Sequence, residues 1–377
     1  MTGTRTVRGR LVTGSAARDA VIAVHGGRVA EVAPAPKGGT DLLIIPGLVD
    51  IHCHGAGGAG FDTPHPDTWR AVRAAHLRRG TTTLLPTLAT ATEDTMAAAL
   101  ATGRRLLADR TPGIAGLHLE GPFLAPEFRG AHAAELIRAR VPAPLPPPAD
   151  DLDGMRIITF APELPGAEAL LSACVDAGAT ASAGHTAATP EDLAKAAAAG
   201  LSHVAHLWSG HSRLTQDGPE RRPGLLEAVL SSDTLTAEAI ADGRHLTAEL
   251  TRIAYRCLGP DRLCLVSDAS PGAGLPDGAS FTLAGGTATV RDGVARSSDG
   301  RTYCGSTSFL VDILRFAVRG AGIGLTDAVR MATTTPARVA GLAPGTGQVV
   351  EGGPATFVLL RPDLTVAGVV EDGERVV

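Results

Sequence analysis

The sequence predicts an α/β fold: a (β/α)8 barrel of the TIM type with a small β-sandwich domain built from both termini. Three observations predict it. Eight short apolar runs, most of them ending in polar residues, recur along the middle of the 377-residue chain. Ala- or Leu-rich stretches of helical character lie between the runs, and both chain ends carry β-strand patterns. Buried parallel strands are near-continuously apolar, and eight strand–helix units are what this barrel requires.

The runs alternate with predicted helices over 66–79, 93–108, 167–177 and 190–199. A Pro-rich segment, 141–148, is expected to leave the barrel as extended chain and to add no strand. The competing fold is a doubly wound open sheet, but no G-x-G-x-x-G follows an early strand. In chain order the eight runs read LVDIHCHG, TTTLLPTLA, IAGLHLEGP, MRIITFAPE, ATASAGHT, SHVAHLW, TAEAIADGRHL and RLCLVSDAS.

The two ends of the chain alternate apolar with polar or small side chains, which predicts short antiparallel strands and hairpins. We expect 1–46 and 345–377 to pair into one small β domain, and 47–344 to form the barrel. The alternative is two separate small sheets, each of which would have little core.

Composition excludes several classes of protein. With 44% hydrophobic and 19% charged residues, the chain does not resemble a disordered one. No apolar run approaches the roughly 18 residues that cross a bilayer, and the first residues lack the apolar stretch of a secretory signal. A net charge of −5 without a basic block gives nucleic acid or an anionic membrane little to bind.

Cysteine and lysine usage narrows the chemistry further. The five cysteines are scattered, odd in number and without a C-x-x-C pair, which argues against a disulfide framework and a thiolate zinc site. They favour the reducing cytoplasm. The only lysines are Lys37, in a Pro/Gly-rich stretch, and Lys195, in an Ala-rich helix. Neither is expected at a strand end, so we do not expect Schiff-base chemistry.

Histidines and carboxylates end five of the eight runs. In a strand, residues two apart project to the same face, so the two histidines of H-C-H can point at one spot. In a barrel the carboxyl ends of the strands converge on one mouth, where the chemistry of this architecture is found. Such a nitrogen and oxygen ligand set suits zinc, iron or manganese. The residues are His52, His54, Glu120, His185, His206 and Asp268.

Each of these residues also has a structural interpretation. A lone buried histidine is more often hydrogen-bonded in a core than bound to a metal, and Glu120 or Asp268 could cap a helix. Their joint occurrence favours a site, because buried carboxylates need partners. His203 faces the opposite side of its strand from His206, so we expect His206 to be the ligand. We interpret the remaining strand and surface histidines as structural: His25, His65, His76 and His118.

The motifs PGLVDIHCHG, GLHLEGPFL, RGAH, SAGHT, AHLW, ADGRH and VSDA, in this order, resemble the amidohydrolase superfamily. Within it the chain looks most like the N-acetylglucosamine-6-phosphate deacetylases, and the LEGPF and GAH pair is the most specific part of the resemblance. The likeness implies a metal-dependent hydrolysis of N-acetylglucosamine 6-phosphate to glucosamine 6-phosphate and acetate. It also implies that the glutamate of LEGP replaces the carboxylated lysine that many superfamily members use.

The resemblance assigns roles to residues of this chain. Glu120, His185 and His206 would be the principal metal ligands, and His52 and His54 would form a second metal site bridged by Glu120. One or two divalent ions are therefore expected, Zn²⁺ foremost, with Fe²⁺ or Mn²⁺ as alternatives. Asp268 would be the general base and then the acid.

Substrate contacts are implied as well. Ala131-His132 of GAH would hold the acetamido group or nearby sugar atoms, and the segment around Cys304-Gly305 would close over the sugar. His245 and Arg221 would face the phosphate, with the arginine coming from the partner in a homodimer, although R-R-P-G also offers Arg222.

The chain departs from the family pattern at the phosphate end. Family members usually carry an Asn–Ala pair after the sixth strand, where this chain reads Ser209-Gly210-His211. Ser209 and the Gly210 amide still offer one hydrogen bond each. The Lys often found before GAH is also replaced, in the stretch Glu127-Phe128-Arg129. These departures leave the metal ligands intact and concern the sugar phosphate.

Three other functions remain open at this point. One is an amidohydrolase that deacetylates a different N-acetyl amino sugar or an N-acyl amino acid, which the altered Ser209-Gly210-His211 segment favours. A second is a non-catalytic binding protein on the same barrel, which would have no use for a base beside a metal. The third is a lysine-free phosphate-binding isomerase, which would not need the two histidines of H-C-H.

Overall fold

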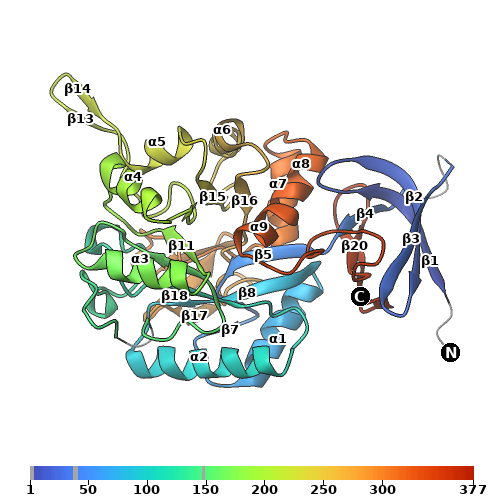
Figure 1. Ribbon diagram of the computed structural model, residues 1–377, viewed down its shortest axis with the longest axis horizontal. Helices are drawn as coiled ribbons and strands as arrows, with labels where there is room; N and C mark the ends of the chain where they lie inside the picture. The colour runs from blue at the N-terminus through green and yellow to red at the C-terminus, as the bar shows by residue number, and fades with distance from the viewer. Residues whose placement is uncertain (1–3, 37–40, 147–148) are drawn as a thin grey trace.

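The computed structural model describes residues 4–36, 41–146 and 149–377 (Figure 1). Two stretches of the predicted small domain lie outside these ranges, namely 1–3 and 37–40, which includes Lys37. Residues 147–148 of the Pro-rich segment lie outside them as well. The described part of that segment is irregular chain, as expected.

The eight predicted runs form eight parallel strands in the order β16-β15-β12-β11-β10-β9-β8-β5. The barrel closes between the first and last strands, where the Asp268 amide donates to the His52 carbonyl over 2.9 Å and the His54 amide to the Ala269 carbonyl over 2.8 Å. The predicted barrel is confirmed. Its strands are β5 (Leu48–Cys53), β8 (Thr81–Ala89), β9 (Leu117–Glu120), β10 (Met155–Phe160), β11 (Thr180–Ala183), β12 (His203–Val204), β15 (Thr236–Ala239) and β16 (Leu263–Leu265).

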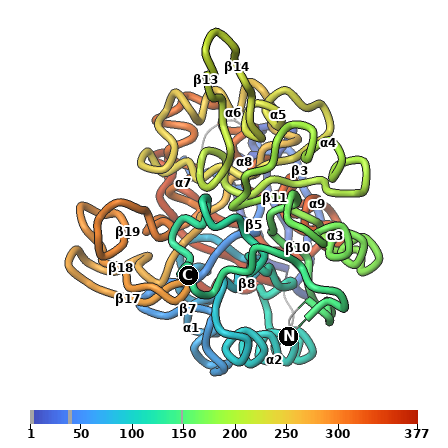
Figure 2. The backbone as a smooth tube through the Cα atoms, turned by 90° about the vertical axis from the view of Figure 1, so that its left-hand side faces the viewer, coloured from blue at the N-terminus to red at the C-terminus, as the bar shows by residue number. Residues whose placement is uncertain are grey.

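Helices surround the barrel strands on all sides (Figure 2). Their starts follow local chemistry: Pro190 opens one helix, and Thr189 and Asp192 cap it by reciprocal hydrogen bonds. Trp69, fully buried, anchors the first helix in the main core. The helices are α1 (Pro66–Leu77), α2 (Glu93–Ala108), α3 (Ala167–Asp176), α4 (Pro190–Ala198), α5 (Leu225–Leu230), α6 (Ala248–Leu258), α7 (Leu310–Arg319), α8 (Leu325–Met331) and α9 (Thr334–Val339).

Both chain ends build one seven-stranded sheet with a core of its own. The central pairing joins the ends, because β20 runs antiparallel to β4 with Val358 opposite Ile45. Two separate small sheets are thereby excluded for the described residues. The domain boundaries at 46/47 and 344/345 stay a prediction. In sheet order the strands are β22 (Glu374–Arg375), β21 (Val366–Glu371), β20 (Phe357–Leu360), β4 (Leu43–Pro46), β1 (Arg5–Val12), β2 (Ala17–His25) and β3 (Arg28–Pro34).

Gly47 joins this sheet to the barrel, because it separates β4 from β5. A Cβ atom at position 47 would lie 2.0 Å from Oγ1 of Thr82 on the neighbouring strand β8. Only a residue without a side chain lets the two strands approach this closely.

The barrel carries two insertions, which the sequence did not predict. A three-stranded antiparallel sheet of β17 (Ser280–Leu283), β18 (Gly286–Arg291) and β19 (Val294–Ser297) follows β16 and has a small apolar core. An exposed hairpin of β13 (Thr215–Asp217) and β14 (Glu220–Arg222) follows β12. The hairpin projects from the end of the molecule that lies farthest from both termini (Figure 1).

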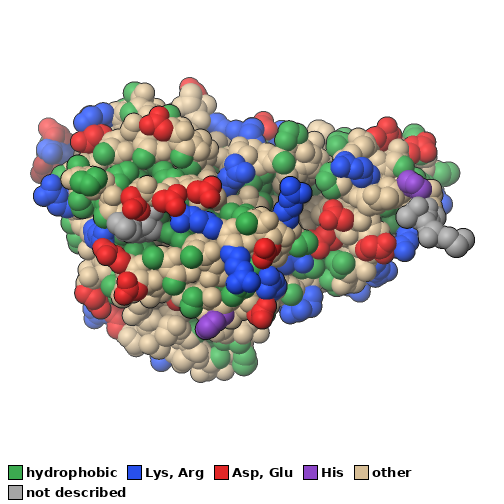
Figure 3. Space-filling model, turned by 60° about the horizontal axis from the view of Figure 1, so that its bottom comes forward, with side chains coloured by type: hydrophobic (Ala, Val, Ile, Leu, Met, Phe, Trp, Pro, Cys, Tyr) green, Lys and Arg blue, Asp and Glu red, His purple; other side chains and the backbone are tan. Residues whose placement is uncertain are grey.

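The remaining short elements are two strands, β6 (Gly55–Ala56) and β7 (Ala59–Gly60), and two 3₁₀ turns, Pro126–Phe128 and Ala134–Leu136. Over the described ranges no helix combines the length and the apolar character that crossing a membrane needs. On the face shown in Figure 3, basic and acidic side chains are interspersed, with no extended field of one sign.

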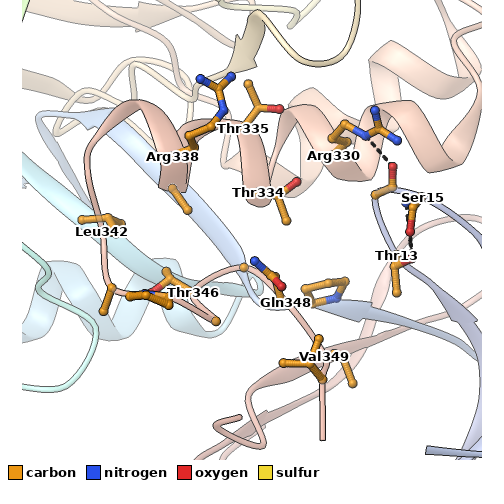
Figure 4. Close-up of a pocket in the computed structure, with 18 of the residues that line it drawn as sticks. Thr13, Ser15, Arg330, Thr334, Thr335, Arg338, Leu342, Thr346, Gln348 and Val349 are labelled. Carbon is orange, nitrogen blue, oxygen red and sulfur yellow. Dashed lines mark hydrogen bonds between the residues drawn. The ribbon is translucent and has the colours of Figure 1, made fainter.

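A cavity of about 690 Å³ lies at the junction of the two domains (Figure 4). Pro46 and Asp261, which precede β5 and β16, line it. It therefore lies at the amino ends of the strands, opposite to the predicted site. Arg330 in this cavity is bound to the Gly14 carbonyl and pairs with Asp261 at 2.9 Å, so it ties the β domain to the barrel.

Candidate active site

The six predicted metal and acid–base residues meet at the carboxyl ends of the barrel strands. His52, His54 and Glu120 lie in or directly after their strands, and none of the six is more than 7% exposed. The other three follow their strands in left-handed backbone: His185 at φ 49°, His206 at φ 21° and Asp268 at φ 45°. Non-glycine residues adopt this conformation at a cost, and such residues cluster at functional sites.

Glu120 is the centre of the group. Its Oε1 lies 2.8 Å from Nε2 of His206 and 3.2 Å from Nε2 of His185. The other oxygen, Oε2, lies 3.4 Å from Nε2 of His54. Oε1 also lies 3.5 Å from Nε2 of His52, so this one carboxylate contacts all four histidines. Asp268 adjoins the same group, with Oδ1 3.2 Å from Nε2 of His54.

Hydrogen bonds at Nδ1 fix the orientation of all four imidazoles. Nδ1 of His52 donates to Oε2 of Glu238 over 2.8 Å. The other three donate to backbone carbonyls: His54 to Thr87 (3.1 Å), His185 to Phe128 (2.8 Å) and His206 to Ser209 (3.0 Å). A histidine that donates through Nδ1 presents the lone pair of Nε2, and metal-binding histidines are held in this way.

This donor set fits a divalent cation. Glu120, His185 and His206 form one group of buried ligand atoms within 4.8 Å of one another, and His52, His54 and Glu120 form a second. Nε2 of His52 is buried without a hydrogen-bond partner, although a buried polar nitrogen costs free energy unless it is bound. Imidazole nitrogens with a carboxylate are ligands that zinc, iron and manganese accept.

In this site, neighbouring charges and hydrogen bonds shift the pKa values of the side chains in the direction opposite to the effect of burial. Burial alone would raise the pKa of Glu120, but the His52 charge and hydrogen bonds from neighbouring imidazoles hold it well below the usual range. Burial likewise opposes the hydrogen bond from His54 that lowers the pKa of Asp268. For His54, burial lowers the pKa, but hydrogen bonds from Nε2 to Asp268 and Glu120 outweigh it and raise the pKa to about 9, so metal binding at Nε2 must release this proton. Both carboxyl groups are therefore ionised at neutral pH, and Asp268 can accept a proton.

Glu238 is a functional residue that the sequence reasoning missed. It is fully buried on β15, where it accepts hydrogen bonds from His52, from Nε2 of His203 and from the His206 amide. A buried carboxylate with three donors is a positioning group for the imidazoles it binds. Its signal was present in the sequence: Glu238 is an acidic residue within the apolar first part, TAEAIA, of the run TAEAIADGRHL.

The predicted substrate residues fall into two groups. Six of them line a cavity of about 250 Å³ beside Glu120 and Asp268, namely Ala131, His132, Ser209, Gly210, His245 and Gly305. Nε2 of His132 lies 3.5 Å from Oε2 of Glu120. Cys304 does not line the cavity, because its side chain packs in the apolar core under β17–β19. Arg301 and Tyr303, which the sequence did not single out, line the cavity in its place.

Arg221 lies outside the cavity of its own chain. It sits on the exposed hairpin strand β14, where Nη1 donates to the Pro219 carbonyl over 3.0 Å. Arg222 pairs with Asp217 at 2.8 Å on the same hairpin. Neither arginine reaches the site within one chain.

Several histidines have the structural role that we expected. His118 is buried, with Nδ1 at 3.0 Å from the Ile51 carbonyl and Nε2 at 2.8 Å from Oγ1 of Thr159. His76 is buried against Cys53 and the Gly55 carbonyl. His25 and His65 are exposed.

Comparison with known proteins places this site in a family. A model described as "Amidohydrolase family" matches residues 43–376. An N-acetylgalactosamine-6-phosphate deacetylase from Shewanella sp. (strain ANA-3) is 34% identical over 337 residues, covering 89% of this chain and 83% of the relative. An N-acetylglucosamine-6-phosphate deacetylase from Haemophilus influenzae is 30% identical over 367 residues, covering 95% and 94%.

The same group appears among solved structures. A mutant N-acetyl-D-glucosamine-6-phosphate deacetylase from Mycobacterium smegmatis, in complex with N-acetyl-D-glucosamine-6-phosphate, has a TM-score of 0.89 and 32% identity over 100% of both chains. The chain therefore belongs to the amidohydrolase family and, within it, to the family of N-acetylglucosamine-6-phosphate deacetylases.

Proposed function

We propose that this protein hydrolyses the N-acetyl group of N-acetylglucosamine 6-phosphate, giving glucosamine 6-phosphate and acetate. The observation that carries the proposal is the buried group of Glu120, His185 and His206 beside the ionised Asp268. The names of the relatives and the substrate bound in the Mycobacterium smegmatis structure support the choice of substrate.

The metal ligands we propose are Glu120, His185 and His206, with His52 and His54 completing a second position that Glu120 bridges. Zn²⁺ is the proposed ion, one or two per chain, because nitrogen-rich sets with one carboxylate suit it; Fe²⁺ and Mn²⁺ are the alternatives. A divalent ion bound there supplies Lewis acidity, which lowers the pKa of water and polarises the amide carbonyl.

The chain's own residues move the proton. Oδ1 of Asp268 accepts a proton from the attacking water and then delivers it to the amide nitrogen, so that the leaving group departs as a neutral amine. His54 holds this carboxylate in place over 3.2 Å. His132 faces the same oxygen of Glu120 as His54, with Nε2 3.5 Å from Oε2. It is proposed to bind the acetamido carbonyl, where one good donor contributes about 3 kcal/mol to the transition state.

A second substrate is favoured by one comparison. The relative from Shewanella is an N-acetylgalactosamine-6-phosphate deacetylase, and it is more similar in sequence than the relative from Haemophilus influenzae. N-acetylgalactosamine 6-phosphate is therefore the second candidate. Parallel assays of the two phosphosugars and an N-acyl amino acid, each at equal enzyme concentration, decide among them.

We also propose that the protein works as a cytoplasmic homodimer. Its five cysteines are all free, which suits a reducing compartment. Arg221 stands on a projecting hairpin where it can reach a partner's cavity and not its own.

The decisive experiment is a deacetylation assay on N-acetylglucosamine 6-phosphate with metal-depleted and zinc-restored protein. We expect activity only after restoration. The variant Asp268→Asn is expected to keep its metal, measured by elemental analysis, and to lose turnover because the amide cannot accept the proton. A metal-loaded Asp268→Asn protein with ordinary turnover would refute the assignment of the base.

A further inference from the structure

The substrate cavity contains one side chain that carries a permanent positive charge. A phosphate monoester bears about −1.5 to −2 charges at neutral pH, so its binding site needs a cation. Of the described residues that line the cavity, Arg301 alone is an arginine, and none is a lysine. Ser209 and Gly210, which stand where the family has its Asn–Ala pair, offer only neutral donors.

His245, the other group expected at the phosphate, is already paired. Its Nδ1 lies 2.8 Å from Oδ2 of Asp242, and the pair is buried. The positive charge of a protonated His245 is therefore offset by a carboxylate at contact distance. Nε2 remains the ring nitrogen that can donate to a ligand, so His245 offers a hydrogen bond with little net charge.

The backbone around Arg301 is fixed, while its side chain is exposed. The Arg301 amide donates to Oδ1 of Asp299 over 3.0 Å, and the Thr302 amide donates to Oγ of Ser297 over 3.1 Å. The next residue, Tyr303, contacts His245 with ring centroids 4.9 Å apart and the ring planes inclined at 56°. Among the described residues no hydrogen bond or ion pair engages the Arg301 guanidinium. The pKa of Asp299 is lowered first by hydrogen bonds from Ser297 and the Arg301 amide, and only to a smaller extent by the Arg301 charge.

This placement follows from the small sheet. The segment 298–303 leaves β19 and returns to it, because Arg296 and Tyr303 form a bridge. Its residues Arg301 and Tyr303 line the cavity. Arg301 thus extends from a turn whose two ends are anchored. An arginine held in this way can bind a phosphate through two parallel N–H groups.

Resting on the proposed function, we propose that Arg301 binds the substrate phosphate from within the same chain and determines the preference for phosphorylated over unphosphorylated amino sugars. The guanidinium of Arg301, in the turn after β19, compensates for the asparagine side-chain amide that the family has where this chain has Ser209-Gly210. Arg301 contacts no reacting atom in this scheme; its effect is on substrate binding.

The test compares wild type with Arg301→Gln and Arg301→Lys. The matched control is Arg291→Gln, which removes one exposed guanidinium from β18 of the same sheet, away from the cavity. Steady-state kinetics are measured on N-acetylglucosamine 6-phosphate and on N-acetylglucosamine, at low and high salt. For Arg301→Gln we expect KM for the phosphosugar to rise by about tenfold or more, as for a lost charged hydrogen bond, with kcat little changed.

The companion measurements separate binding of the phosphate from general damage. KM for the unphosphorylated sugar should not change in Arg301→Gln, the salt dependence of kcat/KM for the phosphosugar should weaken, and Arg301→Lys should restore part of the affinity. Arg291→Gln should behave as wild type. An unchanged KM for the phosphosugar in Arg301→Gln, or an equal loss on both sugars, overturns the inference.

A failure of the proposed function would look different. In that case wild type itself would hydrolyse neither phosphosugar. Titration with inorganic phosphate, followed by calorimetry, then still decides the role of Arg301: weaker binding in Arg301→Gln than in Arg291→Gln supports it, and equal binding rejects it.

Discussion

At the residue scale, the main feature of the site is that each of the four candidate ligand histidines, His52, His54, His185 and His206, has a hydrogen-bond acceptor at Nδ1. Three of the four Nδ1 acceptors are backbone carbonyls, and the fourth is the carboxylate of Glu238. A mutation cannot readily remove a backbone carbonyl, but it can remove Glu238. A substitution of Glu238 therefore tests whether the orientation of His52 and the position of the His206 loop matter for metal binding.

We predict that Glu238→Gln weakens metal binding by about 10- to 100-fold, the usual effect of removing a partner of a ligand histidine. The carboxylate of Glu238 accepts three hydrogen bonds, whereas a glutamine side chain would point an N–H group at one of the three donors, so that hydrogen bond would be lost. Metal competition with a chromophoric chelator measures the affinity. Glu249→Gln, an exposed change on α6, is the control, and equal affinities in the two variants would contradict the prediction.

A second residue-scale prediction concerns acid stability. Burial lowers the pKa of His76 to about 4 in the folded chain, below its ordinary value of 6.5. Between these two values the unfolded chain binds more protons than the folded one, so the free energy of unfolding falls as the pH falls. The buried ring contributes about 3 kcal/mol to this loss, at 1.36 kcal/mol per pKa unit.

His76→Gln should remove that contribution. Denaturant unfolding of the metal-free protein at several pH values between 4 and 6.5 gives the free energy for wild type and variant. The difference between them should shrink or reverse toward pH 4, and a difference that stays constant over this range would show that His76 does not titrate as its burial demands.

At the scale of elements, the strand ends were predictable and the insertions were not. The eight runs could be recognised because parallel strands buried on both faces are continuously apolar, and Ala- and Leu-rich helices separate them. The strands β17–β19 contain Gly, Thr and Ser in short alternations that resemble a long loop. Arg301 was missed with them, since only the fold of that sheet brings it to the cavity.

The candidate site was predictable for similar reasons. Barrel topology converts a histidine at the end of a run into a group at the mouth, so His52, Glu120 and His206 could be assembled from sequence. The carbonyls of Thr87, Phe128 and Ser209 could not, because a backbone acceptor leaves no mark in the sequence.

The hairpin β13–β14 carries a prediction of its own. If Arg221 serves the cavity of a partner, Arg221→Ala and Asp268→Asn are each inactive as pure proteins, yet their mixture is active. A mixed dimer then has one cavity with an intact Asp268 and an intact partner arginine. Co-expression of two differently tagged chains, followed by tandem purification and assay, measures this; an inactive mixed dimer would contradict it.

On the scale of the whole molecule, the two domains meet at the amino ends of the strands, and the chemistry lies at the carboxyl ends. The junction includes the bond from Arg330 to the Gly14 carbonyl and the close approach of Gly47, which links the two domains, to Thr82. Changes at the junction should therefore alter stability more than catalysis.

Gly47→Ala is the sharpest such change. The added methyl would contact Oγ1 of Thr82, so strands β5 and β8 must separate, and we expect a loss of about 1–3 kcal/mol in unfolding free energy. Denaturant unfolding measures it. Adding Thr82→Ala should recover part of this loss. If the losses in unfolding free energy of the two single variants simply add in the double variant, the strain lies elsewhere.

The pairing of β4 with β20 also sets an order of events during synthesis. The first strands leave the ribosome early, but the neighbour that covers the free edge of β4 is about three hundred residues behind it, as Val358 opposite Ile45 shows. Until then Ile44 and Ile45 have an open hydrogen-bonding edge. While the barrel is being translated, this edge is open to pairing with other polypeptides, and it is covered only when β20 has been synthesised.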